Sequence, residues 1–103
     1  MSTTWAVDPE FWRSASAQIR ESSTKLHEGT LSPAVVRNET IQILQALAGH
    51  TPDNTGYLQS LMQIVQDSTD EKLAKVGLIA VAIAERADSA ADLDEHYRGL
   101  LGP

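Results

Sequence analysis

The stretch KVGLIAVAIAER, residues 75–86, contains no polar side chain from Val76 to Ala84. The 103-residue chain around it has a net charge of -6 and a negative mean hydropathy. A helix that is apolar in every direction must be enclosed by other elements. No strand-like alternation of useful length occurs, and β-branched residues do not cluster between turn signals. The sequence therefore predicts an all-α fold, a small antiparallel bundle of four or five helices.

Small side chains alternate with large ones along this stretch. A ridge of small residues at 3-4-3-4 spacing comprises Gly77, Ala80, Ala84, Ala87 and Ala91. Such a ridge lets a neighbouring helix approach closely, which would offset the cost of up to about 1 kcal/mol for Gly77 in a helix interior. Enclosure can come from the chain's own helices or from a second molecule, so that the bundle is complete alone or completed by dimerisation. Leu78 and Val81, if left in water, would mark an interface.

Two helix starts in the first half of the chain have a capping residue before a proline. Asp-Pro stands at residues 8–9 and Ser-Pro at residues 32–33; Asp and Ser accept hydrogen bonds from a first turn, and proline has no N–H to leave unpaired there. The first helix has a narrow heptad-like stripe at 3-4-3-4 spacing that comprises Trp12, Ala15, Ile19, Ser22 and Leu26. Gly29 and Gly49 are expected to end the two helices. The turn residues of 49–57 predict a reversal of the chain.

The second half carries a helical apolar pattern with two potential interruptions. Ser68 and Glu71 form a capping box, so a break near Ser68 and one continuous helix are both open. A weaker box at Ser89 predicts a short final helix, because the acidic residues that follow would be unfavourable at a helix C-terminus. The apolar residues of that final helix are Leu93, Tyr97 and Leu100.

Length and composition restrict the class of protein. A chain of 103 residues supports one core, so residues 1–103 form one domain, with flexible ends expected at 1–7 and 102–103. Fourteen acidic and eight basic residues disfavour binding to nucleic acid or anionic membranes and favour a basic partner. The apolar run is far shorter than the roughly 20 residues of a membrane span. No secretory signal peptide is present, so we expect a cytoplasmic protein or one secreted by another route.

The sequence contains no recognisable catalytic, cofactor or metal motif. It has no cysteine, and its three histidines are isolated without ligand spacing. Serine is frequent in the first helix, but the nucleophile elbow GxSxG is absent. Asp92 and His96 are four apart and predict a surface ion pair rather than a metal site. We therefore expect a protein that is not an enzyme and has no cofactor.

Three segments of the chain are AVDPEFWRSASAQI near the start, TPDNTG near the middle and LIAVAIAERADSAADLDEHY near the end. Together they resemble the small helical substrates of type VII (ESX-type) secretion, in particular their EspC-like branch. The resemblance implies helical hairpins that pair into a four-helix bundle as homodimers or heterodimers, and a role as secretion partner or effector. That family's export signal, Tyr followed four residues later by an acid, is not intact: Asp88 is preceded by Ala84, and Tyr97 is followed by Leu101. Asp88 and Tyr97 mark the region where a signal is expected.

The sequence thus favours a noncatalytic protein-protein interaction module that resembles a type VII secretion substrate. The residues predicted to serve helix packing and dimerisation are Trp12, Ile19, Leu26, Leu73, Val76, Ala80 and Ile83. The alternative is an acidic inhibitor, such as an immunity protein or antitoxin, whose carboxylates engage a basic site. An apolar dimer would be insensitive to salt, whereas the inhibitor's complex would weaken as salt rises.

Overall fold

Helices account for nearly all of the described chain. In order, they are α1 (Pro9–His27), α2 (Pro33–His50), the 3₁₀ turn η1 (Pro52–Asn54), α3 (Thr55–Asp67), α4 (Asp70–Leu73) and α5 (Gly77–Leu101). The computed structural model describes the backbone of residues 8–101 and the side chains of residues 8–89. The flexible ends predicted at 1–7 and 102–103 lie outside the described residues. No strand occurs within residues 8–101, so the predicted all-α bundle is confirmed.

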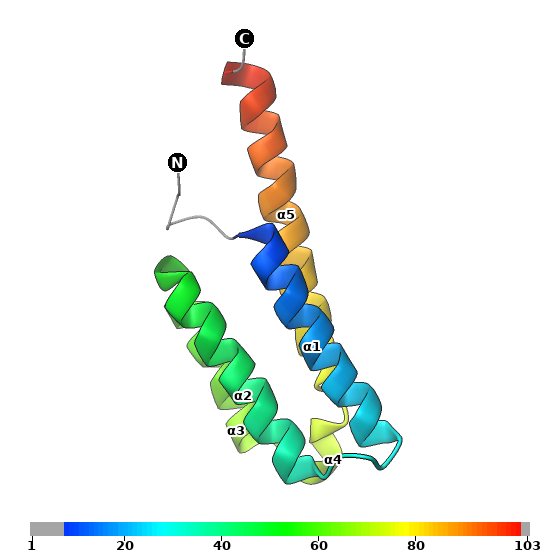
Figure 1. The fold of residues 1–103 in the computed structure, drawn as a ribbon. Helices are drawn as coiled ribbons and strands as arrows, with labels where there is room; N and C mark the ends of the chain where they lie inside the picture. The colour runs from blue at the N-terminus through cyan, green and yellow to red at the C-terminus, as the bar shows by residue number, and fades with distance from the viewer. Residues whose placement is uncertain (1–7, 102–103) are drawn as a thin grey trace.

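The four long helices contribute to one hydrophobic core. Figure 1 shows them as two pairs, α1 with α5 and α2 with α3. Helix α1 packs against both α2 and α5, and α2 packs against α3. Between α5 and α3, the guanidinium carbon of Arg86 lies 4.2 Å from the centre of the Tyr57 ring. The buried apolar residues form one cluster that draws on every helix and comprises Trp12, Ala15, Ile19, Val36, Leu44, Leu47, Leu58, Leu61, Val65, Leu73, Val76, Ala80, Ile83 and Ala87. The core formed by the described residues is therefore built by one chain.

Helix α1 begins as its sequence predicts. The carboxylate of Asp8 accepts hydrogen bonds from the N–H groups of Glu10 at 3.1 Å and Phe11 at 3.3 Å, with Pro9 in the first turn. At its other end, Gly29 has a φ of 78°, the left-handed backbone that favours glycine after a helix. The predicted start and end of this helix are confirmed.

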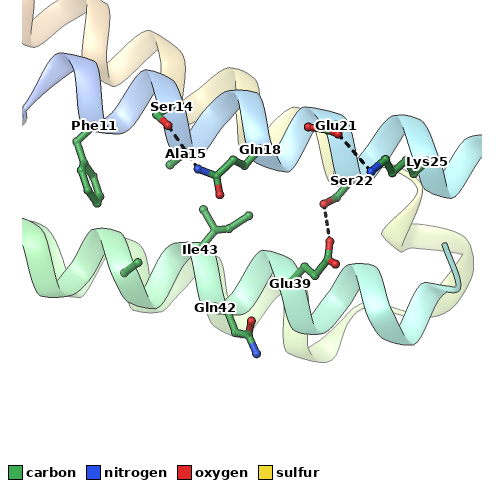
Figure 2. A pocket seen from close by; sticks show the side chains of 11 residues that line it. Phe11, Ser14, Ala15, Gln18, Glu21, Ser22, Lys25, Glu39, Gln42 and Ile43 are labelled. Atoms are coloured by element: carbon green, nitrogen blue, oxygen red, sulfur yellow. Dashed lines mark hydrogen bonds and ion pairs between the residues drawn. The ribbon is translucent and has the colours of Figure 1, made fainter. Parts of the chain in front are cut away.

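Helix α2 also has its predicted start. The hydroxyl of Ser32 accepts a hydrogen bond from the N–H of Val35 at 3.3 Å. The helix continues one residue beyond Gly49, to His50, and the N–H of Thr51 still bonds to Leu47. Figure 2 shows α1 and α2 side by side along most of their length.

The chain breaks its helix near Ser68, the first of the two interruptions that the sequence suggests. Helix α3 ends at Asp67, and Ser68 has an extended backbone. Its hydroxyl donates to the carbonyl oxygen of Ile64 at 2.6 Å, back into α3. The N-cap of α4 is therefore Thr69 rather than the predicted Ser68, and the Thr69 hydroxyl accepts from the N–H of Lys72.

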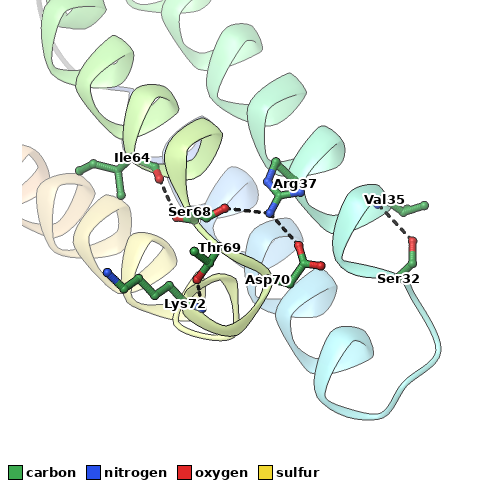
Figure 3. Close-up of polar contacts among 8 residues, drawn as sticks. All are labelled: Ser32, Val35, Arg37, Ile64, Ser68, Thr69, Asp70 and Lys72. Carbon is green, nitrogen blue, oxygen red and sulfur yellow. Dashed lines mark hydrogen bonds and ion pairs between the residues drawn. The ribbon is translucent and has the colours of Figure 1, made fainter.

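Arg37 of α2 holds this break in place (Figure 3). One guanidinium nitrogen of Arg37 donates to the carbonyl oxygen of Ser68 at 2.9 Å and to a carboxylate oxygen of Asp70 at 3.0 Å. A backbone carbonyl freed by a helix end needs such a partner. The contact connects the break to α2, which precedes it by some thirty residues.

Helices α1 and α5 approach each other closely through small side chains. Gly77 lies at the first position of α5, not in a helix interior as predicted, since the preceding residues form a turn. A Cβ atom at Gly77 would lie 3.3 Å from the hydroxyl oxygen of Ser23 on α1. Further along, the buried hydroxyl of Ser16 donates to the carbonyl oxygen of Ala80 at 2.6 Å. The close packing predicted for the small ridge is confirmed at these positions.

Helix α5 is continuous, so the prediction of a separate final helix starting near Ser89 is wrong. It runs from Gly77 to Leu101, which places Asp88 and the following acids in mid-helix, away from the unfavourable C-terminal dipole. Figure 1 shows α5 extending beyond the ends of α1 and α2. The radius of gyration, 15.0 Å, accordingly exceeds the roughly 13 Å typical of a compact domain of this length.

Replacing Ile83 with alanine should destabilise the bundle far more than the same change at Leu78. Ile83 is fully buried on α5, whereas Leu78 on the same helix is 66% exposed. Removing a buried branched side chain leaves a cavity and costs about 2–5 kcal/mol, whereas an exposed site costs about 0.5 kcal/mol or less. Urea unfolding followed by circular dichroism measures both. Equal losses would contradict the orientation of α5.

Replacing Thr40 with valine should raise the free energy of unfolding by about 1 kcal/mol. Thr40 is fully buried on α2, and its hydroxyl has no hydrogen-bond partner among the described residues. A buried hydroxyl without a hydrogen-bond partner lowers the free energy of unfolding by about 1–3 kcal/mol. Valine has nearly the same shape as threonine and lacks the hydroxyl. The unfolding midpoint in urea is the measurement, with Thr24→Val on the exposed side of α1 as control. A loss of stability at position 40 would show that the hydroxyl is satisfied.

Candidate interaction surface

The residues that the sequence assigns to packing and dimerisation are gathered in the core of a single chain. Six of them have almost no exposed surface, namely Trp12, Ile19, Leu73, Val76, Ala80 and Ile83. Leu26 is partly buried against the same core. These side chains serve the first of the two predicted roles, helix packing. They offer little surface to a second molecule while the bundle stays folded.

Trp12 shows why an aromatic residue near a chain start is a poor guide to a binding surface. The ring is fully buried, and its indole nitrogen donates to the hydroxyl of Thr51 at 2.9 Å. It also stacks near Tyr57, with ring centres 6.5 Å apart. Trp12 therefore connects α1 to the turn after α2 and to α3, and its polar atom is satisfied inside the bundle.

The outer face of α5 is apolar in its first turns. Leu78 is 66% exposed and Val81 is 41% exposed, so the chain's own helices leave these two residues of the apolar run uncovered. Of the two sources of enclosure that the sequence leaves open, the chain's own helices do not supply it at these positions. Ala82, partly exposed, lies beside them on the helix surface. Buried Ala80 and Ile83 alternate with these residues, which is the pattern of one helix with a core side and an outer side.

Oppositely charged side chains flank this apolar patch. Lys75 lies one turn before Leu78, and the hydrogen bond from the N–H of Leu78 to the carbonyl of Lys75 shows that the turn leads directly into the helix. Glu85 lies one turn after Val81. Both charged residues are exposed. We call Lys75, Leu78, Val81, Ala82 and Glu85 the α5 face.

Other exposed apolar residues are dispersed over the described side chains. Val35 is 41% exposed at the start of α2, and Ile64 is 57% exposed on α3, where Figure 3 shows it directed away from α2. Phe11 is covered on one side by His50, because their rings stack with centres 4.0 Å apart. Single exposed apolar side chains are normal on a soluble surface. Only α5 places two large ones a turn apart within residues 8–89.

A groove of about 500 Å³ separates α1 from α2 (Figure 2). Its residues alternate between small, apolar and polar, and comprise Phe11, Ser14, Ala15, Gln18, Glu21, Ser22, Lys25, Glu39, Gln42, Ile43 and Ala46. The charges in it have partners within the chain: Ser22 donates to Glu39 at 2.9 Å, and Lys25 pairs with Glu21 at 3.2 Å. The groove has no cluster of unpaired polar groups that would orient a ligand.

The histidines, acids and serines that the sequence suggested for chemistry can be placed in the fold where their side chains are described. No group of three potential metal ligands occurs among the described residues. His27 lies 2.7 Å from the carbonyl oxygen of Ser23, and the predicted pair of Asp92 and His96 lies outside the described side chains. Of the buried serines of α1, Ser16 donates to α5 and Ser22 donates to α2, while Ser23 lies against Gly77. None of the helices in the described part of the chain is long and apolar enough to span a bilayer.

The predicted signal region is divided between described and undescribed side chains. Asp88 is exposed on α5 and pairs with Arg13 of α1 at 2.8 Å. Tyr97 lies in the helical backbone of α5, and its side chain is outside the described residues. Asp88 thus contributes a contact between two helices of the bundle.

Asp8 is the one described group with a shifted titration. Burial opposes its ionisation, but hydrogen bonds from the Phe11 N–H, from His50 and from the Glu10 N–H outweigh burial and hold the pKa of Asp8 below its ordinary value. The carboxylate therefore joins the start of α1 to the end of α2, since His50 lies 3.3 Å from it.

Comparison with known proteins gives no further assignment: no family model, no curated protein and no solved structure matches the chain. The type VII resemblance therefore rests on the quoted segments alone. The single chain contributes four long helices to one bundle, whereas that resemblance implies two-helix hairpins that need a second chain.

The stability of the bundle should fall in acid partly through Asp8. Its folded pKa lies below its unfolded pKa, so its contribution is complete above the unfolded value, near pH 4, and is lost as the pH falls through the folded value. Asp8→Asn keeps a capping side chain that does not titrate. The difference in unfolding free energy between the two proteins should shrink as the pH falls below about 4. A difference that stays constant to pH 2 would contradict the shift.

Proposed function

We propose that the protein is a noncatalytic protein-protein interaction module that binds its partner through the α5 face. The observation that carries this proposal is the exposure of Leu78 and Val81, a turn apart, on a helix whose other side builds the core. The core is closed without them, so their exposure is not a gap in the fold. Paired exposed apolar residues on a helix are typical of a docking surface.

The energy available at this face is sufficient for a specific but modest contact. Full burial of a Leu or Val side chain contributes about 1.5–3 kcal/mol. Leu78 is two-thirds exposed and Val81 less, so most of this gain is still available to a partner at Leu78. The charged residues at the ends of the face, Lys75 and Glu85, would determine the orientation of the bound partner more than the affinity of the complex.

The type VII resemblance supplies a more specific form of the proposal, in which the partner belongs to a secretion system. It is supported by the three quoted segments, one of which includes most of the α5 face. Export of the protein into the medium by cells that carry such a system, and its loss when the secretion ATPase is deleted, would test this form. Retention in both strains would contradict it.

The acidic-inhibitor alternative has less support among the described residues. Several carboxylates are already engaged within the chain: Asp8 with His50, Asp70 with Arg37, and Asp88 with Arg13. An inhibitor that engages a basic site needs carboxylates that are free and concentrated on one face.

A photo-activated cross-linking residue at position 78 should trap protein, and the same residue at position 35 should not. Val35 is a suitable control because it is as exposed as Val81 but lies on α2. The variants are expressed and irradiated in cells, and the adducts are separated by mass and identified by mass spectrometry. Reproducible adducts of defined mass only at position 78 are expected. Equal trapping at both positions, or none at 78, would contradict the proposal.

A further inference from the structure

We infer that the partner at the α5 face is a second copy of this chain, with the two α5 helices packed antiparallel. This inference rests on the proposed function and adds the identity of the partner. The inference is based on the charges and side-chain sizes of the α5 face. When a second copy of this face is placed opposite the first by a two-fold rotation, the charges and sizes of the two copies are complementary.

The arrangement of charge supplies the first argument. Along the α5 face the order is a basic residue, Lys75, then Leu78 and Val81, then an acidic residue, Glu85. In an antiparallel pair whose two-fold axis passes near the level of Ala80, each Lys75 lies opposite Glu85 of the other copy. A parallel pair would instead place Lys75 beside Lys75 and Glu85 beside Glu85. Two-fold pairs of this kind are the most common form of homodimer.

These two charges are available for such contacts. Neither Lys75 nor Glu85 takes part in an ion pair or side-chain hydrogen bond among the described residues, and both are exposed. The neighbouring Arg86 is engaged elsewhere, since its guanidinium donates twice to the side-chain oxygen of Asn54, at 3.0 and 2.8 Å. The charged groups at both ends of the α5 face are therefore available to a partner.

The sizes of the side chains supply the second argument. In the same register, Leu78 of one copy lies opposite Ala82 of the other, so a large side chain meets a small one twice across the axis. Helices pack by placing ridges of one into grooves of the other, and alternation of large and small residues satisfies this. Val81 lies next to the two-fold axis, so the Val81 side chains of the two copies come close to each other.

The contact is small, and the dimer is correspondingly weak. Two helices that meet over about three turns bury less than the roughly 1,600 Å² of a standard interface. A dissociation constant in the micromolar range or above is expected. The measurement must therefore extend from about 5 μM to about 1 mM, at an ionic strength that screens the net charge of -6 on each chain.

Sedimentation equilibrium of the purified full chain tests the inference. The wild-type protein should show a reversible monomer–dimer equilibrium. Lys75→Glu and Glu85→Lys should each weaken the dimer about tenfold, because each introduces two like-charge contacts across the axis. The double swap Lys75→Glu with Glu85→Lys should return the dissociation constant to within about threefold of the wild-type value, since the pairs are restored.

Leu78→Asp should leave only monomer over the same range, and Val35→Asp should leave the wild-type dimer. Val35 occupies the first turn of α2, where aspartate is compatible with the helix. Thermal unfolding of every variant confirms that it is folded. Failure of the double swap to rescue dimerisation would overturn the antiparallel register, and a dimer unaffected by Leu78→Asp would overturn the assigned face.

The outcomes also separate this inference from the proposal beneath it. A wild-type monomer at 1 mM that still gives cross-linked adducts with a different protein at position 78 overturns self-pairing and retains the interaction module. A monomer without adducts at position 78 overturns both. A dimer with the predicted swap behaviour supports both.

Discussion

The close packing of α5 against α1 is the constraint on which the rest of the structure depends. Gly77 and Ala80 on α5 lie against Ser23 and Ser16 on α1, and the Ser16 hydroxyl is satisfied by the carbonyl of Ala80. The close approach of the two backbones therefore leaves the buried Ser16 hydroxyl paired. Once α5 turns its small residues toward α1, its rotation about its own axis is determined, and Ile83 and Ala87 must point into the core.

That rotation leaves an apolar outer side, because a bundle of four helices can cover only part of each helix. The run from Val76 to Ala84 is apolar in all directions, so whichever side faces outward carries apolar residues. In this chain the outward residues are Leu78 and Val81. The surface proposed for binding is thus a direct consequence of how α5 packs, and it requires no special loop or cavity.

Polar side chains determine where the helices stop and how their ends are joined. Arg37 accommodates the break after α3 by bonding to the freed carbonyl of Ser68, and Arg86 connects α5 to the turn before α3 through Asn54. Trp12 reaches the same turn through Thr51. These contacts join elements that are distant in the sequence. They fix how the ends of the helices are placed relative to one another, which apolar burial alone does not do because the hydrophobic effect is not directional.

The sequence by itself determined the helical class and the starts of α1 and α2, because caps, prolines and apolar spacing act over a few residues. It left the break near Ser68 open against one continuous helix, and the structure decided for the break. It also identified core residues of α5, such as Ile83, because apolar residues that recur at helical spacing mark the buried side of a helix. It did not determine which residues of the apolar run face outward, since a uniformly apolar helix has no preferred side. It also misplaced the end of α5, because Ser89 and its acids resemble a helix start. Only the tertiary structure decided these points. Packing against α1 selected the inner side of α5 and left Leu78 exposed. Asp88, which pairs with Arg13 of α1, lies in the middle of α5, and the helix continues beyond it to Leu101.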